Sequence, residues 1–280
     1  MRTLKTAASA LLIASCALGA LGAPALAQIK LSEALPYSPM VGQEGKDVIW
    51  VPTPQPLVDL MLDTAKLTPA DKLVDLGSGD GRLVITAAKR GASARGIEYN
   101  PDLVGLAKRQ AAAQGVGGKA VFEEADIFES DFSEANVVTL FLLPALNLRL
   151  RPTLLDMAPG TRIVANSFTM DDWKPDEIAQ LAGEACEGWC TAYKWVVPAK
   201  VEGVWQLGDD KVLTLKQEFQ MLTGTLRDRG VSAPIRDARL YGDEIRYSVY
   251  GDTYVGRVKG SQMEGLRNDT EAWQAKAAAR

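Results

Sequence analysis

Residues 73–82 read Leu73-Val74-Asp75-Leu76-Gly77-Ser78-Gly79-Asp80-Gly81-Arg82, and the rest of the chain is arranged around them. An apolar run meets an acidic residue, glycine then occupies every second position, and the apolar residues 83–85 follow. This order predicts a strand, a tight glycine turn and a helix N-terminus, which bring backbone N–H groups close to a polar ligand. Glycine suits the turn because a Cβ would hinder a positive φ or the approach of the ligand. Taken alone, the stretch also fits an ordinary strand-to-helix turn.

Segments with strand and helix patterns alternate around this turn. We expect strands at 94–98, 120–124, 137–143 and 162–168, and a helix at 101–114. An earlier helix is expected from Pro54 to Leu67, with Thr53 as its N-cap. Strands that alternate with helices predict an α/β fold with a Rossmann-like, doubly wound parallel sheet.

The pattern changes after residue 197. Short alternating runs, separated by turns such as Gly208-Asp209-Asp210, predict a small antiparallel β domain over residues 198–267. Residues 268–280 form a polar segment that we expect to be a helical tail. The chain therefore divides into an α/β domain at 28–197, the β domain and the tail.

The first 27 residues have the composition of a secretory signal peptide. Basic Arg2 and Lys5 precede an apolar stretch at 10–21, and Ala25-Leu26-Ala27 provides a small-x-small cleavage site. We therefore expect a periplasmic or secreted protein without a transmembrane segment after cleavage. Two alternatives remain open at this stage. The segment could stay as an uncleaved anchor, or Cys16 could be lipidated, because residues 13–16 resemble a bacterial lipobox.

Charge and cysteine content narrow the classes of partner. The net charge is −4, and removal of two positive charges with residues 1–27 makes it −4 − 2 = −6. An acidic chain without basic blocks is a poor candidate for binding nucleic acid. Cys186 and Cys190 could form a disulfide in an oxidising compartment or remain two reduced thiols. We expect no metal site, because the chain has no histidine and no further thiols.

Acidic residues follow the neighbouring strands at matching places. Glu98 ends the strand after the glycine turn, and Asp126 follows the next strand. The carboxyl ends of parallel strands meet at one rim, so these side chains should lie together. Glu98 could accept both hydroxyls of an adenosine ribose, in S-adenosylmethionine or in a nicotinamide dinucleotide. Arg82, which stands where the dinucleotide fingerprint has its third glycine, disfavours the second choice.

The sequence here resembles the class I S-adenosylmethionine-dependent methyltransferases. The resemblance is carried by Asp75 with Gly77, Gly79 and Gly81, and by Glu98 and Asp126. It is closest to exported bacterial members and to the mitochondrial and archaeal protein-lysine methyltransferases, whose shared features appear as Val51-Pro52-Thr53-Pro54, Leu142-Leu143-Pro144, Leu150-Arg151-Pro152 and Val164-Ala165-Asn166-Ser167-Phe168. It covers residues 50 to about 175.

This resemblance implies a cofactor, S-adenosyl-L-methionine, and a set of residues to hold it. Asp75 would bind the amino group, Glu98 the ribose, Asp126 and Ile127 the adenine, and Leu142 would line the methyl-donor face. The full set of implied cofactor residues is Asp75, Gly77, Ser78, Gly79, Gly81, Glu98, Asp126, Ile127 and Leu142.

The resemblance also implies transfer of a methyl group, with a protein lysine as the expected acceptor. No catalytic residue can be assigned. Asp171 or Asp172, with Asn166 and Trp173, could help to deprotonate a lysine, although a solvated loop is the competing interpretation. Export conflicts with a cofactor that is made in the cytosol, so an exported, non-enzymatic binding module on a methyltransferase fold remains the alternative hypothesis.

Overall fold

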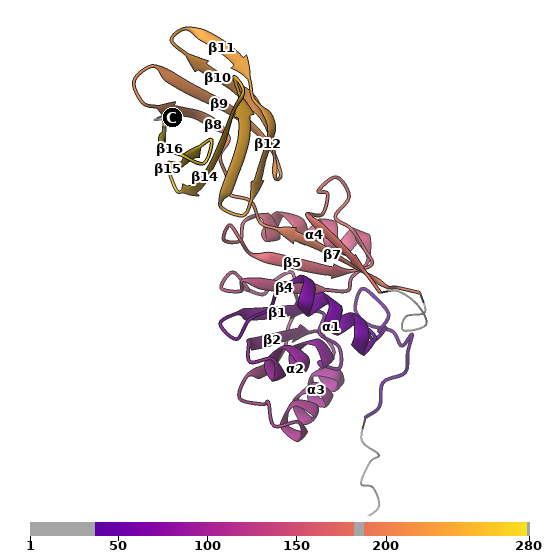
Figure 1. The fold of residues 1–280 in the computed structure, drawn as a ribbon. Coiled ribbons are helices and arrows are strands. Elements are labelled where there is room, and N and C mark those ends of the chain that lie inside the picture. The colour runs from indigo at the N-terminus through magenta and orange to yellow at the C-terminus, as the bar shows by residue number, and fades with distance from the viewer. Residues whose placement is uncertain (1–36, 182–187, 279–280) are drawn as a thin grey trace, which may run out of the picture. The chain divides into compact units, whose positions relative to one another are not determined.

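The computed structural model describes residues 37–181 and 188–278. Its first part is a seven-stranded sheet with helices on both faces (Figure 1). The strand order is β3-β2-β1-β4-β5-β7-β6. The strands are β1 (Lys72–Leu76), β2 (Ser93–Glu98), β3 (Ala120–Glu124), β4 (Val137–Leu140), β5 (Arg162–Asn166), β6 (Glu177–Gln180) and β7 (Thr191–Val196). The helices are α1 (Gln55–Thr64), α2 (Arg82–Lys89), α3 (Pro101–Ala113) and α4 (Pro144–Leu155).

Two apolar cores lie on the two faces of this sheet. Successive residues of β1 point to opposite faces. Leu73 packs into one core with residues of α1, α2 and α3, whereas Val74 packs into the other with Leu150 and Leu154 of α4. All four residues of β4 are buried, as expected for a central strand covered on both faces. The predicted α/β fold is confirmed.

The five predicted strands pair in parallel, and the sheet continues beyond β5 with two strands that the sequence did not indicate. β7 runs antiparallel to β5, and β6 runs antiparallel to β7. A chain that turns straight back needs no crossover helix, and none lies between these strands among the described residues. The expected strand ends also move, because β4 ends at Leu140 and β5 at Asn166. Ser167, with φ of 59°, leaves the extended conformation directly after β5.

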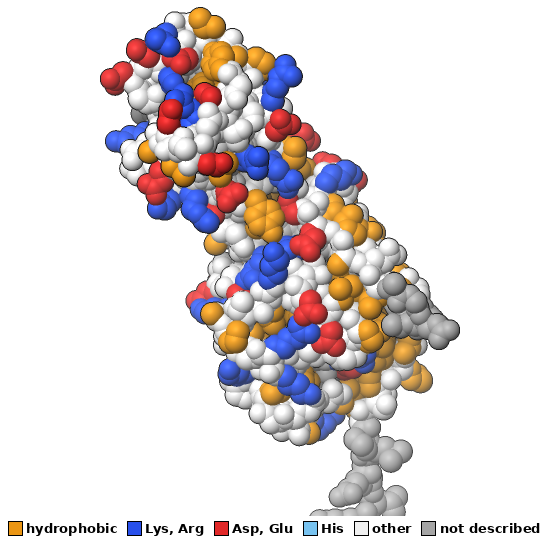
Figure 2. All heavy atoms as spheres, viewed as in Figure 1, with side chains coloured by type: hydrophobic (Ala, Val, Ile, Leu, Met, Phe, Trp, Pro, Cys, Tyr) orange, Lys and Arg blue, Asp and Glu red, His pale blue; other side chains and the backbone are white. Residues whose placement is uncertain are grey.

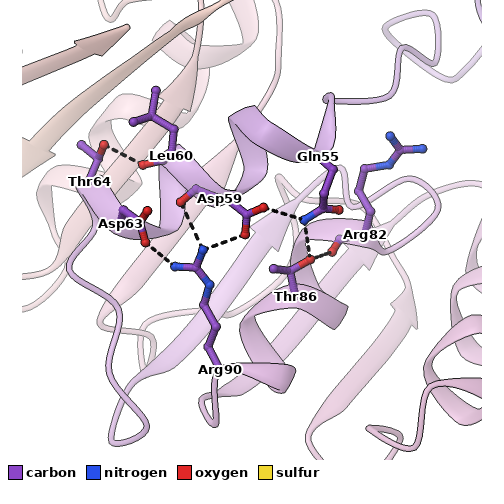
Figure 3. Close-up of polar contacts among 8 residues, drawn as sticks. All are labelled: Gln55, Asp59, Leu60, Asp63, Thr64, Arg82, Thr86 and Arg90. Atoms are coloured by element: carbon purple, nitrogen blue, oxygen red, sulfur yellow. Dashed lines mark hydrogen bonds and ion pairs between the residues drawn. The ribbon is translucent and has the colours of Figure 1, made fainter. Parts of the chain in front are cut away.

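The beginning of α1 also differs from the expectation. Pro54 occupies the N-cap position, and no side chain caps the helix, so the prediction of Thr53 as N-cap is wrong. Polar contacts join α1 to α2 and to the residue that follows α2 (Figure 3). Arg90, which follows α2, donates to Asp59 over 2.7 Å and to Asp63 over 2.5 Å, and Gln55 donates to Thr86 over 3.2 Å.

The second part is a separate antiparallel sheet, also as predicted. Its nine strands are β8 (Gly203–Leu207), β9 (Lys211–Glu218), β10 (Met221–Asp228), β11 (Val231–Pro234), β12 (Arg236–Tyr241), β13 (Glu244–Val249), β14 (Asp252–Lys259), β15 (Gln262–Arg267) and β16 (Glu271–Ala277). Pairing of β9 with β10 closes the sheet on itself. Its core contains the stacked rings of Tyr247 and Tyr254, whose centroids are 4.8 Å apart.

The expected helical tail is a strand. β16 pairs with β15 on one side and with β8 on the other, and it buries Trp273 and Ala275. These two residues alternate with exposed ones, which is a strand pattern. The polar composition around them concealed it. Trp273 packs edge-on against Tyr247 and Tyr254, so the segment completes the second core.

Candidate functional site

The glycine turn adopts backbone conformations that favour glycine. Gly77, Gly79 and Gly81 have φ values of 78°, 53° and 81°. A Cβ on Gly79 would lie 2.7 Å from Nε1 of Trp50, and a Cβ on Gly81 would lie 2.6 Å from the ring of Phe122. Larger residues would therefore strain the turn and collide with neighbours at both positions.

Glu98 connects the end of β2 to this turn. Its Oε2 accepts a hydrogen bond from the backbone N–H of Gly79 over 2.9 Å, and its Oε1 accepts one from the N–H of Asn100 over 2.9 Å. Each carboxylate oxygen has a further lone pair. Two oxygens held in this way can accept from two vicinal hydroxyls, which is what a ribose requires.

Asp75 lies deeper, at the end of β1. Only 7% of its surface is exposed, and its Oδ1 accepts a hydrogen bond from Oγ1 of Thr139 over 2.7 Å. Burial raises the pKa of the Asp75 carboxyl to about 7, the Thr139 hydrogen bond opposes this, and the nearby carboxyl groups of Glu98 and Asp80 add to the rise. Burial and the nearby acids disfavour the ionised form of Asp75, and a cationic amino group beside it would stabilise that form.

Asp126 carries a partner that the sequence did not suggest. Its Oδ2 accepts from the Lys46 ammonium over 2.5 Å, and its Oδ1 accepts from the N–H of Phe128 over 2.9 Å. The Lys46 hydrogen bond lowers the pKa of Asp126, and the same bond raises the pKa of Lys46. The ammonium also lies 4.6 Å from the centre of the Tyr99 ring. Lys46 thus occupies the acceptor that we assigned to adenine.

The structure brings most of the predicted site residues around one pocket. Its lining includes Asp75, Gly77, Ser78, Gly79, Glu98, Asp126, Ile127 and Leu142. Gly81 is the exception among the predicted residues. It is the N-cap residue of α2, and the space for a Cβ there is filled by Phe122 and Ala107.

The residues considered for lysine deprotonation do not line this pocket. Asp172 forms an ion pair with Arg151, which lowers the pKa of its carboxyl, and Trp173 is buried against Trp195. Asn166 contacts the lining, since its Nδ2 lies 3.4 Å from Oγ1 of Thr53, a residue of the lining. The exposed Asp171 lies outside the lining as well.

The sequence did not indicate that residues before α1 and the first residue of α2 contribute contacts to the site. Lys46 and Trp50 belong to the segment before α1, which closes on itself because Gln43 and Trp50 share a backbone hydrogen bond of 2.9 Å. Arg82 joins this segment to the turn, as it binds the Asp80 carboxylate and donates to the Thr53 carbonyl over 2.9 Å. The sequence offered no periodic signal for these contacts, which link distant positions.

The lining fits an adenosyl amino acid. A buried carboxylate provides a cation site, a second carboxylate can take vicinal hydroxyls, and a third can accept from an exocyclic amine. The Ser78 hydroxyl is buried in this lining and has no hydrogen-bond partner among the described residues. Buried hydroxyls without partners are rare, so a polar ligand is a reasonable complement.

Comparison with known proteins agrees with this fit. Residues 75–177 match the model of the ANTKMT methyltransferase domain. A protein-lysine N-methyltransferase of Saccharolobus islandicus is 42% identical over 137 residues, which are 48% of this chain and 85% of that protein. The adenine nucleotide translocase lysine N-methyltransferase of Mus musculus is 37% identical over 106 residues, which are 37% of this chain and 46% of the mouse protein.

A solved structure points to the same class. It is an RNA methyltransferase of Salinibacter ruber in complex with S-adenosyl-L-homocysteine, with 46% identity, a TM-score of 0.51, and coverage of 54% of this chain and 96% of that one. The chain belongs to the class I S-adenosylmethionine-dependent methyltransferases. S-Adenosylmethionine is its cofactor, and the chain is an enzyme rather than a binding module on an enzyme fold.

Replacing Lys46 by methionine is expected to tighten S-adenosylhomocysteine binding by about two- to fivefold at low salt. The reason is that adenine would no longer have to displace the Lys46 ammonium from Asp126, and the gain is small because exposed ion pairs are weak. Titration calorimetry at low and high NaCl measures the effect, which should shrink at high salt. Lys46→Arg, which keeps the charge, is the control. Weaker binding by Lys46→Met would contradict competition at Asp126.

Proposed function

We propose that this methyltransferase modifies the side-chain nitrogen of lysine in a protein. The observation that carries the proposal is the 42% identity to a protein-lysine N-methyltransferase, over 85% of that relative. The family model and the mouse relative, which is named for lysine methylation, support it as well. Figure 2 adds that Lys, Arg, Asp and Glu side chains are interspersed over the visible face, where a nucleic-acid-binding protein would gather positive charge.

The reaction requires positioning and an unprotonated acceptor. S-Adenosylmethionine supplies a methyl group that is bound to a sulfonium. When the methyl group is transferred by in-line displacement, the sulfur leaves as a neutral thioether. A pH of 7 is about 3.4 units below the reference pKa of lysine, so deprotonation of the side chain at this pH costs about 4.6 kcal/mol. The enzyme must provide conditions that lower this cost.

Four of the acidic side chains in the lining are engaged or assigned to the cofactor, and the other two, Glu44 and Asp47, are exposed to water. Glu98 accepts from two backbone N–H groups, Asp126 binds Lys46, and Asp80 binds Arg82. We assign Asp75 to binding of the amino group of the cofactor. The chain contains no histidine that could act as a base. Removal of the acceptor from water is therefore the means by which this pocket favours the neutral amine.

The proposal is tested with mature protein, methyl-labelled S-adenosylmethionine and a cell-envelope extract. We expect label in the protein fraction, sensitive to protease and resistant to ribonuclease, and methyl-lysine after acid hydrolysis. Heat-inactivated enzyme and Glu98→Ala enzyme are the controls. Label that is released by ribonuclease would overturn the lysine proposal in favour of an RNA acceptor, as in the name of the Salinibacter ruber protein.

We further propose that the enzyme is exported. The pattern of residues 1–27, which lie outside the described residues, supports this, and so does the disulfide-bonded state of Cys190. Cys186, the partner expected from the sequence, also lies outside the described residues. Among the described residues, no helix has the length and apolar character required to cross a bilayer.

Fractionation of cells tests the export proposal. We expect the mature chain, shortened by residues 1–27, in the envelope or the medium, with Cys186 and Cys190 resistant to thiol labelling until reduction. A full-length cytosolic chain with reactive thiols would overturn export.

A further inference from the structure

Three aromatic side chains form one cluster in the lining of the cofactor pocket. The rings of Phe141 and Phe168 stack with their centroids 6.1 Å apart and an angle of 18° between their planes. The ring of Trp189 meets Phe141 edge-on, with centroids 5.7 Å apart. The three residues come from the ends of β4, β5 and the approach to β7, so the fold rather than the local sequence assembles them.

This cluster lies beside the methionine end of the expected cofactor site. Leu142, the neighbour of Phe141, places its Cδ2 3.2 Å from the Cβ position of Gly77. Gly77 and Asp75 belong to the same lining as the three rings. Trp189 is 46% exposed, whereas Phe141 and Phe168 are half-buried, so the cluster extends from the interior of the pocket to its surface.

We propose that Phe141, Phe168 and Trp189 form the acceptor slot, which holds the unbranched side chain of a lysine. This inference rests on the proposed function and names the residues that carry its specificity. The aliphatic stem of lysine is apolar and packs against rings, while its nitrogen reaches the donor end of the pocket. The walls of the slot are apolar rings in mutual contact, so they exclude water and do not themselves supply a base.

Aromatic walls suit this reaction because positive charge develops on the acceptor nitrogen. The amine enters neutral, after giving its proton to water. Its lone pair forms the new N–C bond, the C–S bond breaks with its electron pair going to sulfur, and the positive charge moves from sulfur to nitrogen. Ring faces attract a cation through their electron-rich π-systems. The slot therefore favours the charge that develops on nitrogen over the neutral amine that enters.

Ligand binding tests the slot without knowledge of the natural acceptor. The probes are S-adenosylhomocysteine and an analogue in which nitrogen replaces the sulfur and carries a two-carbon link to a butylamino group. The amine of that group stands where the lysine nitrogen would lie, and its butyl chain imitates the lysine stem. We expect the wild-type protein to bind the analogue at least about tenfold more tightly than S-adenosylhomocysteine. Trp189→Ala and Phe168→Ala should lose most of this gain and bind S-adenosylhomocysteine within about twofold of the wild-type protein.

Controls separate recognition from loss of structure. Trp189→Phe keeps an aromatic face and should retain most of the gain, and Tyr241→Ala removes an exposed ring of the second sheet and should change nothing. An analogue with an equally long chain that ends in a carboxylate should show no gain, because ring faces repel anions.

The outcomes distinguish this inference from the proposed function. Equal binding of the two probes by the wild-type protein, or an unchanged gain in both alanine variants, overturns the slot even if lysine is methylated. Transfer of label to RNA overturns the proposed function, whatever the analogue shows. If the alanine variants lost the tighter binding of the analogue only when they also lost S-adenosylhomocysteine binding or a cooperative melting transition, the rings would have a structural role. That result would overturn the slot as well.

Discussion

Glu98→Ala is expected to weaken S-adenosylhomocysteine binding by about ten- to a hundredfold. The carboxylate is the acceptor assigned to the ribose hydroxyls, and it also fixes the N–H of Gly79 at 2.9 Å. Hydrogen bonds to charged groups contribute about 1.5–3 kcal/mol each, and about 1.4 kcal/mol corresponds to a tenfold change in affinity. Calorimetric titration of the folded variant measures the loss.

A neighbouring acid offers a matched control. Glu124 stands opposite Glu98 in the register of β2 and β3, is exposed and does not line the pocket. Glu124→Ala should therefore bind the ligand as the wild-type protein does. Melting curves of both variants show whether the turn remains formed. Unchanged affinity in a folded Glu98→Ala protein would remove Glu98 from the site.

The glycine turn and its acids could be predicted because their chemistry is local. Glycine at positions 77, 79 and 81 indicates the left-handed backbone that the structure shows. An acidic residue at the end of a strand indicates the edge of a parallel sheet where ligands bind. The order of strands and helices then follows from the alternation of patterns, since consecutive elements lie side by side in this topology. These features needed no knowledge of distant contacts.

Features that depend on distant contacts escaped prediction. Lys46 reaches Asp126 across 80 positions, and no periodic pattern marks Lys46 as a contact of the site. The aromatic cluster joins three segments in the same manner. Trp173 was considered as a candidate residue of the site beside two acids, yet it is buried against Trp195 and Phe219. The strand at Glu271–Ala277 was hidden because only two of its side chains are buried.

Cofactor affinity is expected to fall by about thirtyfold between pH 7.5 and pH 5.5. Burial raises the pKa of Asp75 to about 7 in the ligand-free protein. The amino group of the ligand is a cation that needs the ionised carboxylate, so below pH 7 it must displace a proton, at about tenfold per pH unit. The absence of histidine from the chain leaves few other groups that titrate in this range.

The same pKa has the opposite consequence for the ligand-free fold. A carboxyl whose pKa rises from 3.8 to about 7 on folding binds its proton more tightly in the folded state. The contribution of Asp75 to stability is therefore greatest below about pH 4 and declines as the pH rises toward 7. The ligand-induced rise in melting temperature should accordingly be larger at pH 7.5 than at pH 5.5.

Asp75→Asn isolates this residue from the rest of the pocket. Its amide oxygen can still accept from Thr139, so the packing at the end of β1 is kept while the charge is lost. We expect weak binding with little dependence on pH over the same interval, measured by titration calorimetry at several pH values. If the wild-type protein and Asp75→Asn showed the same pH profile, the cation site would have to lie elsewhere in the pocket. The methionine end of the cofactor, and with it the side on which the acceptor enters, would then need to be reassigned.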